Sequence, residues 1–113
     1  MTCFLLLLSE QGQTQTPNTV SVGFSNVSNS AVIVKGYTVV NAMKKPGQLL
    51  PMQKKGKAFE GDVPVGIRYF TVYDANTNRI LLMDQPVPIQ NNTFLTIATS
   101  PLDPNKVVIV STK

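Results

Sequence analysis

Apolar and polar residues alternate along much of the chain between residues 19 and 113. Residues 20–25, VSVGFS, carry an apolar side chain at their first, third and fifth positions. A period of two is typical of a strand with one buried face. The same alternation returns in later segments, at spacings typical of an all-β sandwich or barrel.

We predict seven or eight short strands. They are expected at about residues 19–26, 31–41, 58–63, 67–73, 79–84, 93–99 and 106–111, with edge segments at 48–53 and 85–89. Pro51, Pro86 and Pro88 confine the two edge segments to sheet edges, because proline cannot donate a ladder hydrogen bond. Gly36 indicates a bulge or bend in its strand, and the Pro-Gly pair at residues 46–47 predicts a type II turn.

Residues 67–73 form the strongest strand of the sequence. We assign Phe70 and Val72 to its inner face, opposite Arg68 and Asp74. A register error of one residue would exchange the two faces and place the tyrosines of this strand in the core.

The predicted fold is all-β, a single antiparallel β-sandwich of immunoglobulin-like or prealbumin-like type over residues 19–113. A chain of 113 residues is enough for one domain. The connections are short, and no segment shows a ten-residue helical pattern. Since parallel strands need crossovers of a dozen or more residues, we expect antiparallel pairing throughout.

Residues 61–74, GDVPVGIRYFTVYD, combine a Pro-x-Gly step, an aromatic strand and an aspartate turn. This segment resembles the corresponding part of prealbumin-like and PEGA-like β-sandwich modules. The resemblance implies that the Pro-x-Gly step leads the chain into a central strand that ends in a turn. It implies no particular function, because such modules mostly present loops or connect other domains.

Residues 1–18 are expected to lie outside the domain. The apolar run CFLLLL at residues 3–8 is too short to cross a bilayer as a helix. It resembles the hydrophobic part of a secretory signal peptide, without the basic residues that should precede it. We favour a signal-peptide remnant followed by a flexible tether; the alternative is a native strand or helix that packs on the domain. Cys3 is the only cysteine, so no intramolecular disulfide can form.

The composition favours a secreted, periplasmic or cell-surface protein. Charged residues make up 14% of the chain, which is low for a globular protein, and Ser, Thr, Asn and Gln supply the balance. The net charge of +4 is uneven, because residues 1–57 hold six lysines and one acid. An anionic partner would therefore meet one region and not the whole surface.

Residues 44–57 are the strongest functional candidate, because paired lysines flank a small apolar tip. The candidate residues for binding an anionic ligand are Lys44, Lys45, Leu49, Leu50, Met52, Lys54, Lys55 and Lys57. The lysines would attract an anionic polysaccharide or a lipid surface, and the tip would be buried against it. The alternative is that these lysines are solvated loop residues that prevent an edge strand from pairing with other molecules.

Asp74, Asn76 and Asn78 place oxygen ligands at alternate positions, as the start of a calcium loop does. Arg79 stands where such a loop needs glycine, and Gln85 replaces the bidentate glutamate. A plain hairpin turn accounts for all of these residues. We therefore expect no metal site, with these three residues as a weak calcium candidate.

Catalysis is disfavoured because the chain contains no histidine, which excludes Ser-His and Cys-His pairs. The acidic side chains of residues 58–113 are Glu60, Asp62, Asp74, Asp84 and Asp103. Most lie beside predicted turns, where carboxylates accept hydrogen bonds from backbone amides. Two of them could still approach each other as a general acid and base.

We therefore expect a non-enzymatic binding or structural module without a cofactor, whose partner is a protein or polysaccharide at the cell surface. The first alternative is a cationic protein that docks on anionic polysaccharide or lipid through residues 44–57. The second is an enzyme that uses clustered carboxylates. Nucleic acid is not expected, because no aromatic residue interleaves with the lysines of this segment. No oligomeric state follows from the sequence.

Overall fold

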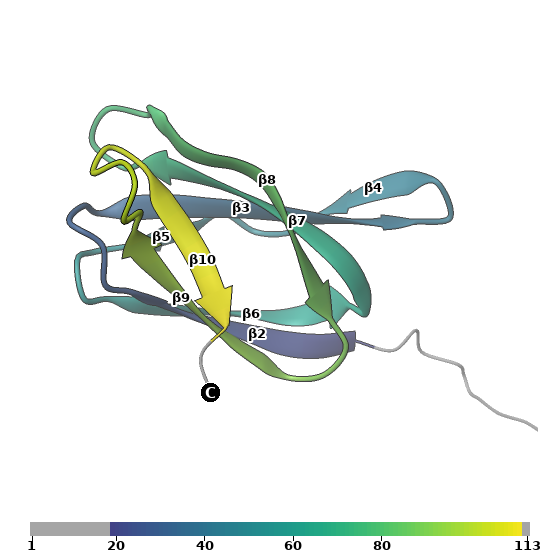
Figure 1. Cartoon of the computed structure of the whole chain (residues 1–113). Coiled ribbons are helices and arrows are strands. Elements are labelled where there is room, and N and C mark those ends of the chain that lie inside the picture. Colours follow the sequence, from purple (N-terminus) through teal and green to yellow (C-terminus); the bar gives the residue numbers. More distant parts are fainter. Residues whose placement is uncertain (1–18, 112–113) are drawn as a thin grey trace, which may run out of the picture.

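The computed structural model describes residues 19–111, which form two β-sheets packed face to face (Figure 1). The strands are β2 (Thr19–Asn26), β3 (Val32–Val40), β4 (Met43–Pro46), β5 (Leu50–Met52), β6 (Lys57–Pro64), β7 (Gly66–Asp74), β8 (Ile80–Ile89), β9 (Thr93–Thr99) and β10 (Val107–Ser111). No helix occurs among the described residues. The all-β fold with two sheets is therefore confirmed, while the expectation for residues 1–18 lies outside the described residues.

One sheet has the strand order β10-β9-β2-β6, and the other has the order β4-β3-β7-β8, with β5 also paired to β3. Neighbouring strands are antiparallel except for β2 and β9, which are parallel. The expectation of antiparallel pairing throughout was therefore wrong. The crossover that a parallel pair requires is present, because the whole second sheet lies between β2 and β9 in the sequence.

The hydrophobic core lies between the inner faces of the two sheets. Its buried apolar side chains are Val22, Phe24, Val32, Val34, Leu50, Met52, Val63, Phe70, Val72, Leu81, Ile89, Leu95, Ile97, Val107 and Ile109. Phe24 of β2 and Phe70 of β7 meet edge to face with their ring centroids 5.3 Å apart, a geometry that aromatic pairs prefer. This contact joins the two sheets.

The inner face of β7 carries Phe70 and Val72, as the alternation predicted. Arg68 is also on this face and is only 1% exposed. Asp74 shares the face as well, since its register partner is the buried Val32. The assignment of Arg68 and Asp74 to the opposite side was therefore wrong. Side chains two residues apart point to the same face of a strand, and Arg68 therefore accompanies Phe70. Tyr69 and Tyr73 occupy the outer face and are half-buried.

A two-residue turn at Asn41 and Ala42 joins β3 to β4, and this hairpin projects from the end of the sandwich (Figure 1). Both turn residues have positive φ, 53° and 65°, as a type I′ hairpin turn requires. The predicted type II turn at residues 46–47 is absent, because it needs a positive φ at Gly47. Among the described glycines only Gly66 has one.

The edge positions of the prolines are confirmed. Pro86 and Pro88 lie on β8 at one edge of their sheet, and Pro51 lies on β5 at the opposite edge. Gly36 makes no bulge, since β3 and β7 pair without interruption through it. The register shifts lie between β2 and β6 and between β7 and β8.

Replacing Phe70 with alanine tests this arrangement of the core. The variant is expected to lose about 3–5 kcal/mol of unfolding free energy, because the removed ring leaves a cavity beside Phe24. Chemical denaturation measures this loss. Phe59→Ala is the matched control, since Phe59 is 60% exposed, and its cost should be below ~1 kcal/mol. Equal costs for the two variants would contradict the assignment of the inner face.

Candidate functional site

The fold divides the basic segment 44–57 between two places. Lys44 lies on β4 opposite Val39 of β3, whereas Met52 at the end of β5 lies opposite Val32. These two positions are seven residues apart along β3, which corresponds to about 23 Å. The paired lysines at residues 54–55 follow Met52, so they are not part of one patch with Lys44. All five lysines of the segment are exposed, and ligand binding by them stays a prediction.

The proposed apolar tip is not formed. Leu50 and Met52 are 6% and 4% exposed, because alternate side chains of β5 face the core. The inclusion of these two residues in a surface site was therefore wrong. Leu49 is 59% exposed and is the only residue of the expected tip on the surface.

The outer face of the five-stranded sheet carries the chain's three tyrosines. We call this surface, built from Lys35, Tyr37, Lys44, Tyr69 and Tyr73, the tyrosine face. Tyr37 of β3 lies directly opposite Tyr69 of β7, and the two rings stack with centroids 5.2 Å apart and an interplanar angle of 20°.

A row of flat side chains crosses the sheet through this tyrosine pair. Pro46 of β4 is the register partner of Tyr37, and Pro86 of β8 is the partner of Tyr69. Both prolines are exposed. Since neighbouring strands are about 4.8 Å apart, the four residues span about 14 Å.

A second apolar row crosses the same face four residues further along β7. Tyr73 lies between its register partners Ile33 of β3 and Ile80 of β8. The two rows are about 13 Å apart, given the rise of a strand. A polar strip separates them: Lys35 pairs with Thr71 in register, and the Thr71 hydroxyl donates a hydrogen bond of 3.2 Å to Asp84.

A lysine lies above one tyrosine ring of each row. The Lys44 ammonium lies 4.6 Å from the ring centroid of Tyr37, and the Lys35 ammonium lies 5.9 Å from that of Tyr73. Both distances are within the range of cation–π attraction. Folding therefore brings an aromatic ring to Lys44 although none interleaves with the lysines in the sequence, and the expectation of no nucleic acid stays a prediction.

Two shallow grooves follow the tyrosine face. The larger has a volume of about 360 Å³ and is lined by Lys35, Gly36, Tyr37, Lys44, Pro46, Thr71, Tyr73, Met83 and Asp84. The smaller, of about 250 Å³, is lined by Ile33, Lys35, Leu49, Tyr73 and Asn78. Both grooves share Lys35 and Tyr73, so they form one path along the sheet.

Sequence reasoning missed the tyrosine face because its residues come from different strands. Tyr69 and Tyr73 share one face of residues 67–73, and this signal was present in the alternation. The contribution of Tyr37 depends on the pairing of β3 with β7, which sequence periodicity does not specify.

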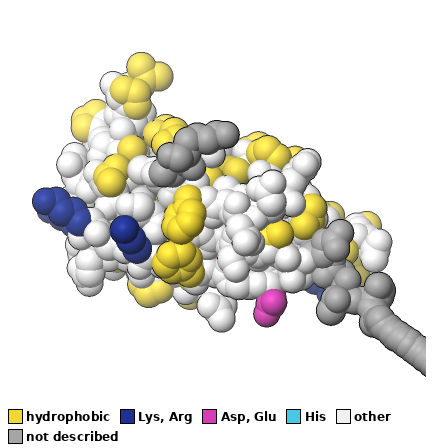
Figure 2. All heavy atoms as spheres, turned by 90° about the horizontal axis from the view of Figure 1, so that it is seen from below, with side chains coloured by type: hydrophobic (Ala, Val, Ile, Leu, Met, Phe, Trp, Pro, Cys, Tyr) yellow, Lys and Arg dark blue, Asp and Glu magenta, His cyan; other side chains and the backbone are white. Residues whose placement is uncertain are grey.

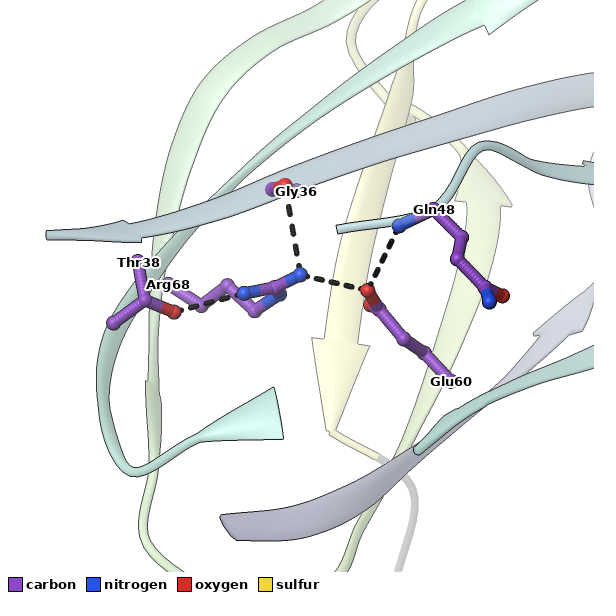
Figure 3. A network of polar contacts seen from close by, with 5 residues as sticks. All are labelled: Gly36, Thr38, Gln48, Glu60 and Arg68. Atoms are coloured by element: carbon purple, nitrogen blue, oxygen red, sulfur yellow. Dashed lines mark hydrogen bonds and ion pairs between the residues drawn. The ribbon is translucent and has the colours of Figure 1, made fainter. Parts of the chain in front are cut away.

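A buried ion pair lies on the inner side of the same sheet (Figure 3). Arg68 donates from Nη2 to Oε2 of Glu60 at 2.9 Å and from Nη1 to the Thr38 hydroxyl at 2.8 Å. The same Glu60 oxygen accepts a hydrogen bond from the backbone amide of Gln48 at 3.1 Å. Arg68 Nη2 is also 3.5 Å from the carbonyl oxygen of Gly36. The pair thus ties β6 of one sheet to β7 and β3 of the other.

Two glycines leave room for this network. A Cβ atom at Gly36 would lie 2.8 Å from Nε of Arg68 and 2.9 Å from the ring of Phe70. A Cβ atom at Gly47 would collide with Glu60 and with Arg68. Gly36 is thus needed for close packing and not for a bulge. The Nε of Arg68 is the only buried side-chain polar atom of the described residues without a hydrogen-bond partner.

The ion pair involves one of the carboxylates that the second alternative, an enzyme with clustered carboxylates, would use. A pocket of about 310 Å³ beside it is lined by Thr19, Val40, Lys45, Pro46, Gly47, Glu60, Asp62, Pro64 and Arg68. Glu60 and Asp62 are therefore near each other, as a carboxylate pair would need. However, Glu60 is 5% exposed and its Oε2 is bonded to Arg68 and Gln48. A carboxylate held in this way serves the fold.

The weak calcium candidate forms a capped hairpin turn. Asp74 Oδ1 accepts hydrogen bonds from the backbone amides of Asn76 at 2.8 Å and Thr77 at 3.1 Å, as expected for an aspartate at a turn. Asn78 has a φ of 60°. Within residues 19–111 no three His, Cys, Asp or Glu side chains gather as a metal site would require. Calcium binding by Asp74, Asn76 and Asn78 stays a prediction.

Comparisons with known proteins bear on the fold alone. No family model matches the sequence, and no curated protein matches it. A similar solved structure is the NMR structure of a protein from Eubacterium rectale, with a TM-score of 0.59 and 10% sequence identity, covering 90% of this chain and 96% of that chain. The described part of the chain has no helix of the length and apolar character needed to cross a membrane.

Breaking the ion pair is expected to destabilise the fold more than removing it entirely. Glu60→Leu or Arg68→Leu alone leaves an unpaired buried charge and should cost about 3–5 kcal/mol. The double variant should cost less than either single variant, and a double-mutant cycle of chemical denaturation measures the difference. Asp62→Asn is the control and should change stability by less than ~0.5 kcal/mol. Strictly additive losses would contradict the coupling.

Proposed function

We propose that this protein is a non-enzymatic binding module whose tyrosine face holds an extended acidic polysaccharide. The observation that carries the proposal is the arrangement of two tyrosine rows on either side of a polar strip, with a lysine above a ring in each row. Such a face offers flat apolar surfaces and polar groups in alternation along one groove. Binding sites combine apolar or aromatic surface with a few placed polar groups in the same way.

The chemistry of a sugar chain matches this alternation. The C–H faces of a pyranose ring pack on aromatic rings. Among the described residues, lysines lie above the rings of Tyr37 and Tyr73 but not above that of Tyr69. The Asp84 carboxylate and the Thr71 hydroxyl can exchange hydrogen bonds with sugar hydroxyls. Lys35 and Lys44 can pair with the carboxylate or sulfate groups of an acidic polysaccharide.

The same features disfavour the other anionic partners. A lipid surface would need an apolar tip, and Leu50 and Met52 are in the core. A nucleic acid would use the tyrosines for base stacking, but it also needs a continuous basic track along its backbone. The two lysines of the tyrosine face share it with Asp84, so the track is short and interrupted.

Two further parts of the proposal, the location of the protein and its structural relatives, rest on the sequence analysis. We propose a location outside the cytoplasm or on the cell surface, which fits a polysaccharide partner. We also propose that the module is related to prealbumin-like or immunoglobulin-like sandwiches. In support, the Pro64-Val65-Gly66 step leads from β6 into β7, an inner strand of its sheet, and β7 ends at the turn after Asp74.

Binding to polygalacturonate, a carboxylated polysaccharide, tests the proposal. Tyr69→Thr should weaken the affinity by about tenfold, which is the loss expected for a residue at the centre of a binding surface. Isothermal titration calorimetry with the full chain measures the affinity, and circular dichroism checks that the variant is folded. Neutral dextran should bind more weakly than polygalacturonate, and the difference should shrink at high salt.

A pair of charge-matched variants separates the tyrosine face from the rest of the basic segment. Lys35→Gln with Lys44→Gln should reduce binding strongly, whereas Lys54→Gln with Lys55→Gln should leave it nearly unchanged. Both double variants remove two positive charges, so long-range attraction changes equally. Equal losses would show that only net charge matters and would refute the proposed site. Stronger binding of oligothymidylate than of polygalacturonate would favour nucleic acid instead.

A further inference from the structure

The outer face of the other sheet carries an exposed aromatic pair. Phe59 of β6 and Phe94 of β9 are 60% and 53% exposed, and their rings meet edge to face at 5.6 Å. Val110 of β10 is 47% exposed, and alternation places it on the same face. We call this surface, seen in Figure 2, the phenylalanine face. Exposed apolar patches of this kind on a sheet commonly mark an interaction surface.

Gly23 forms the floor of the phenylalanine face. This residue of β2 is the register partner of both Phe59 and Phe94. A Cβ atom at Gly23 would lie 2.6 Å from the ring of Phe94 and 2.8 Å from that of Phe59. The two rings therefore meet above the glycine, and the sheet presents them together as one low apolar platform.

Charges of opposite sign flank the platform along β6. Lys57 and Asp62 are exposed and lie on either side of Phe59. The register shift against β2 adds one residue to β6 between Glu60 and Val63, and such a bulge interrupts the alternation. Asp62 therefore shares the side of Lys57, and the two are about 13 Å apart given the rise of a strand. Figure 2 shows apolar side chains gathered at the middle of this face, basic side chains towards one end and an acidic side chain towards the other. The order along the edge is basic, apolar, acidic.

From this order we infer that the phenylalanine face binds the same face of a second copy of this chain. A two-fold axis lying in the interface at right angles to β6 would stack β6 on its copy in the opposite direction. Such an axis brings Lys57 of each copy to Asp62 of the other and superimposes the two phenylalanine pairs. Two-fold dimers are the commonest protein assemblies, and their contacts are reciprocal in this way.

The dimer is expected to be weak and to present two binding surfaces. One face of a four-stranded sheet is a small interface, and interfaces at the low end of the size range belong to transient complexes. The tyrosine face lies on the opposite side of the sandwich, so it remains open in both copies. Two such faces on one particle would bind a polymeric ligand more tightly than either alone. The self-association itself does not depend on the proposed function.

Sedimentation velocity of the full chain over a range of concentrations tests the inference. The parent chain should shift towards dimer as its concentration rises. Phe59→Thr with Phe94→Thr should remain monomeric, while retaining a strand-compatible residue at each position. Met83→Thr is the matched control, because Met83 is 63% exposed on β8 of the other sheet, and it should dimerise as the parent does.

A charge-exchange experiment tests the two-fold geometry. Lys57→Asp alone and Asp62→Lys alone should each weaken dimerisation, because each places like charges at both reciprocal contacts. An equimolar mixture of the two variants should recover dimer, since both contacts of the mixed dimer are then attractive. Thermal unfolding checks that each variant is folded.

Three results would overturn the inference. They are a parent chain that stays monomeric at millimolar concentration, association that survives loss of both phenylalanines, and a variant mixture that associates no better than its components. A monomeric parent that binds neutral lipid vesicles through the same two phenylalanines would also overturn it, in favour of a membrane surface.

Discussion

The rest of the structure depends on the buried ion pair between Arg68 and Glu60. It joins a strand of one sheet to a strand of the other at the end of the sandwich where β6 turns into β7. Buried charges need partners, because an unpaired charge in the interior costs several kcal/mol. Arg68 and Glu60 therefore constrain their neighbourhood: Thr38 must supply a hydroxyl, and residues 36 and 47 must be glycines.

This constraint extends to the proposed binding surface. The backbone of residues 47–48 turns towards Glu60, where the Gln48 amide donates to its carboxylate, and the edge strand is divided there into β4 and β5. The separate β4 pairs with the end of β3 and continues as a projecting hairpin (Figure 1). Lys44 thereby reaches the ring of Tyr37. A buried charge on one side of the sheet thus helps to position a cation on the other.

Periodicity predicted the parts of the fold that depend on one strand at a time. The alternation placed Phe70 and Val72 inside, and the prolines placed β8 and β5 at edges. Arg68 shares the register of Phe70, but its burial requires Glu60 from the other sheet, and strand periodicity does not reveal such a partner. The prediction that residues 44–57 form one basic patch around an apolar tip was wrong for a related reason. Its residues are adjacent in sequence, yet alternation buries Leu50 and Met52, while strand pairing separates Lys44 from the later lysines.

The central claim is that the ligand lies across the tyrosine face. Nuclear magnetic resonance of the isotope-labelled full chain, titrated with an oligogalacturonate, locates the ligand residue by residue. The account predicts that amide shifts concentrate on β3, β4 and β7, around Tyr37, Lys44, Tyr69 and Tyr73, and are negligible on β6 and β9. Shifts that concentrate instead at residues 54–57 or around Phe59 and Phe94 would contradict it.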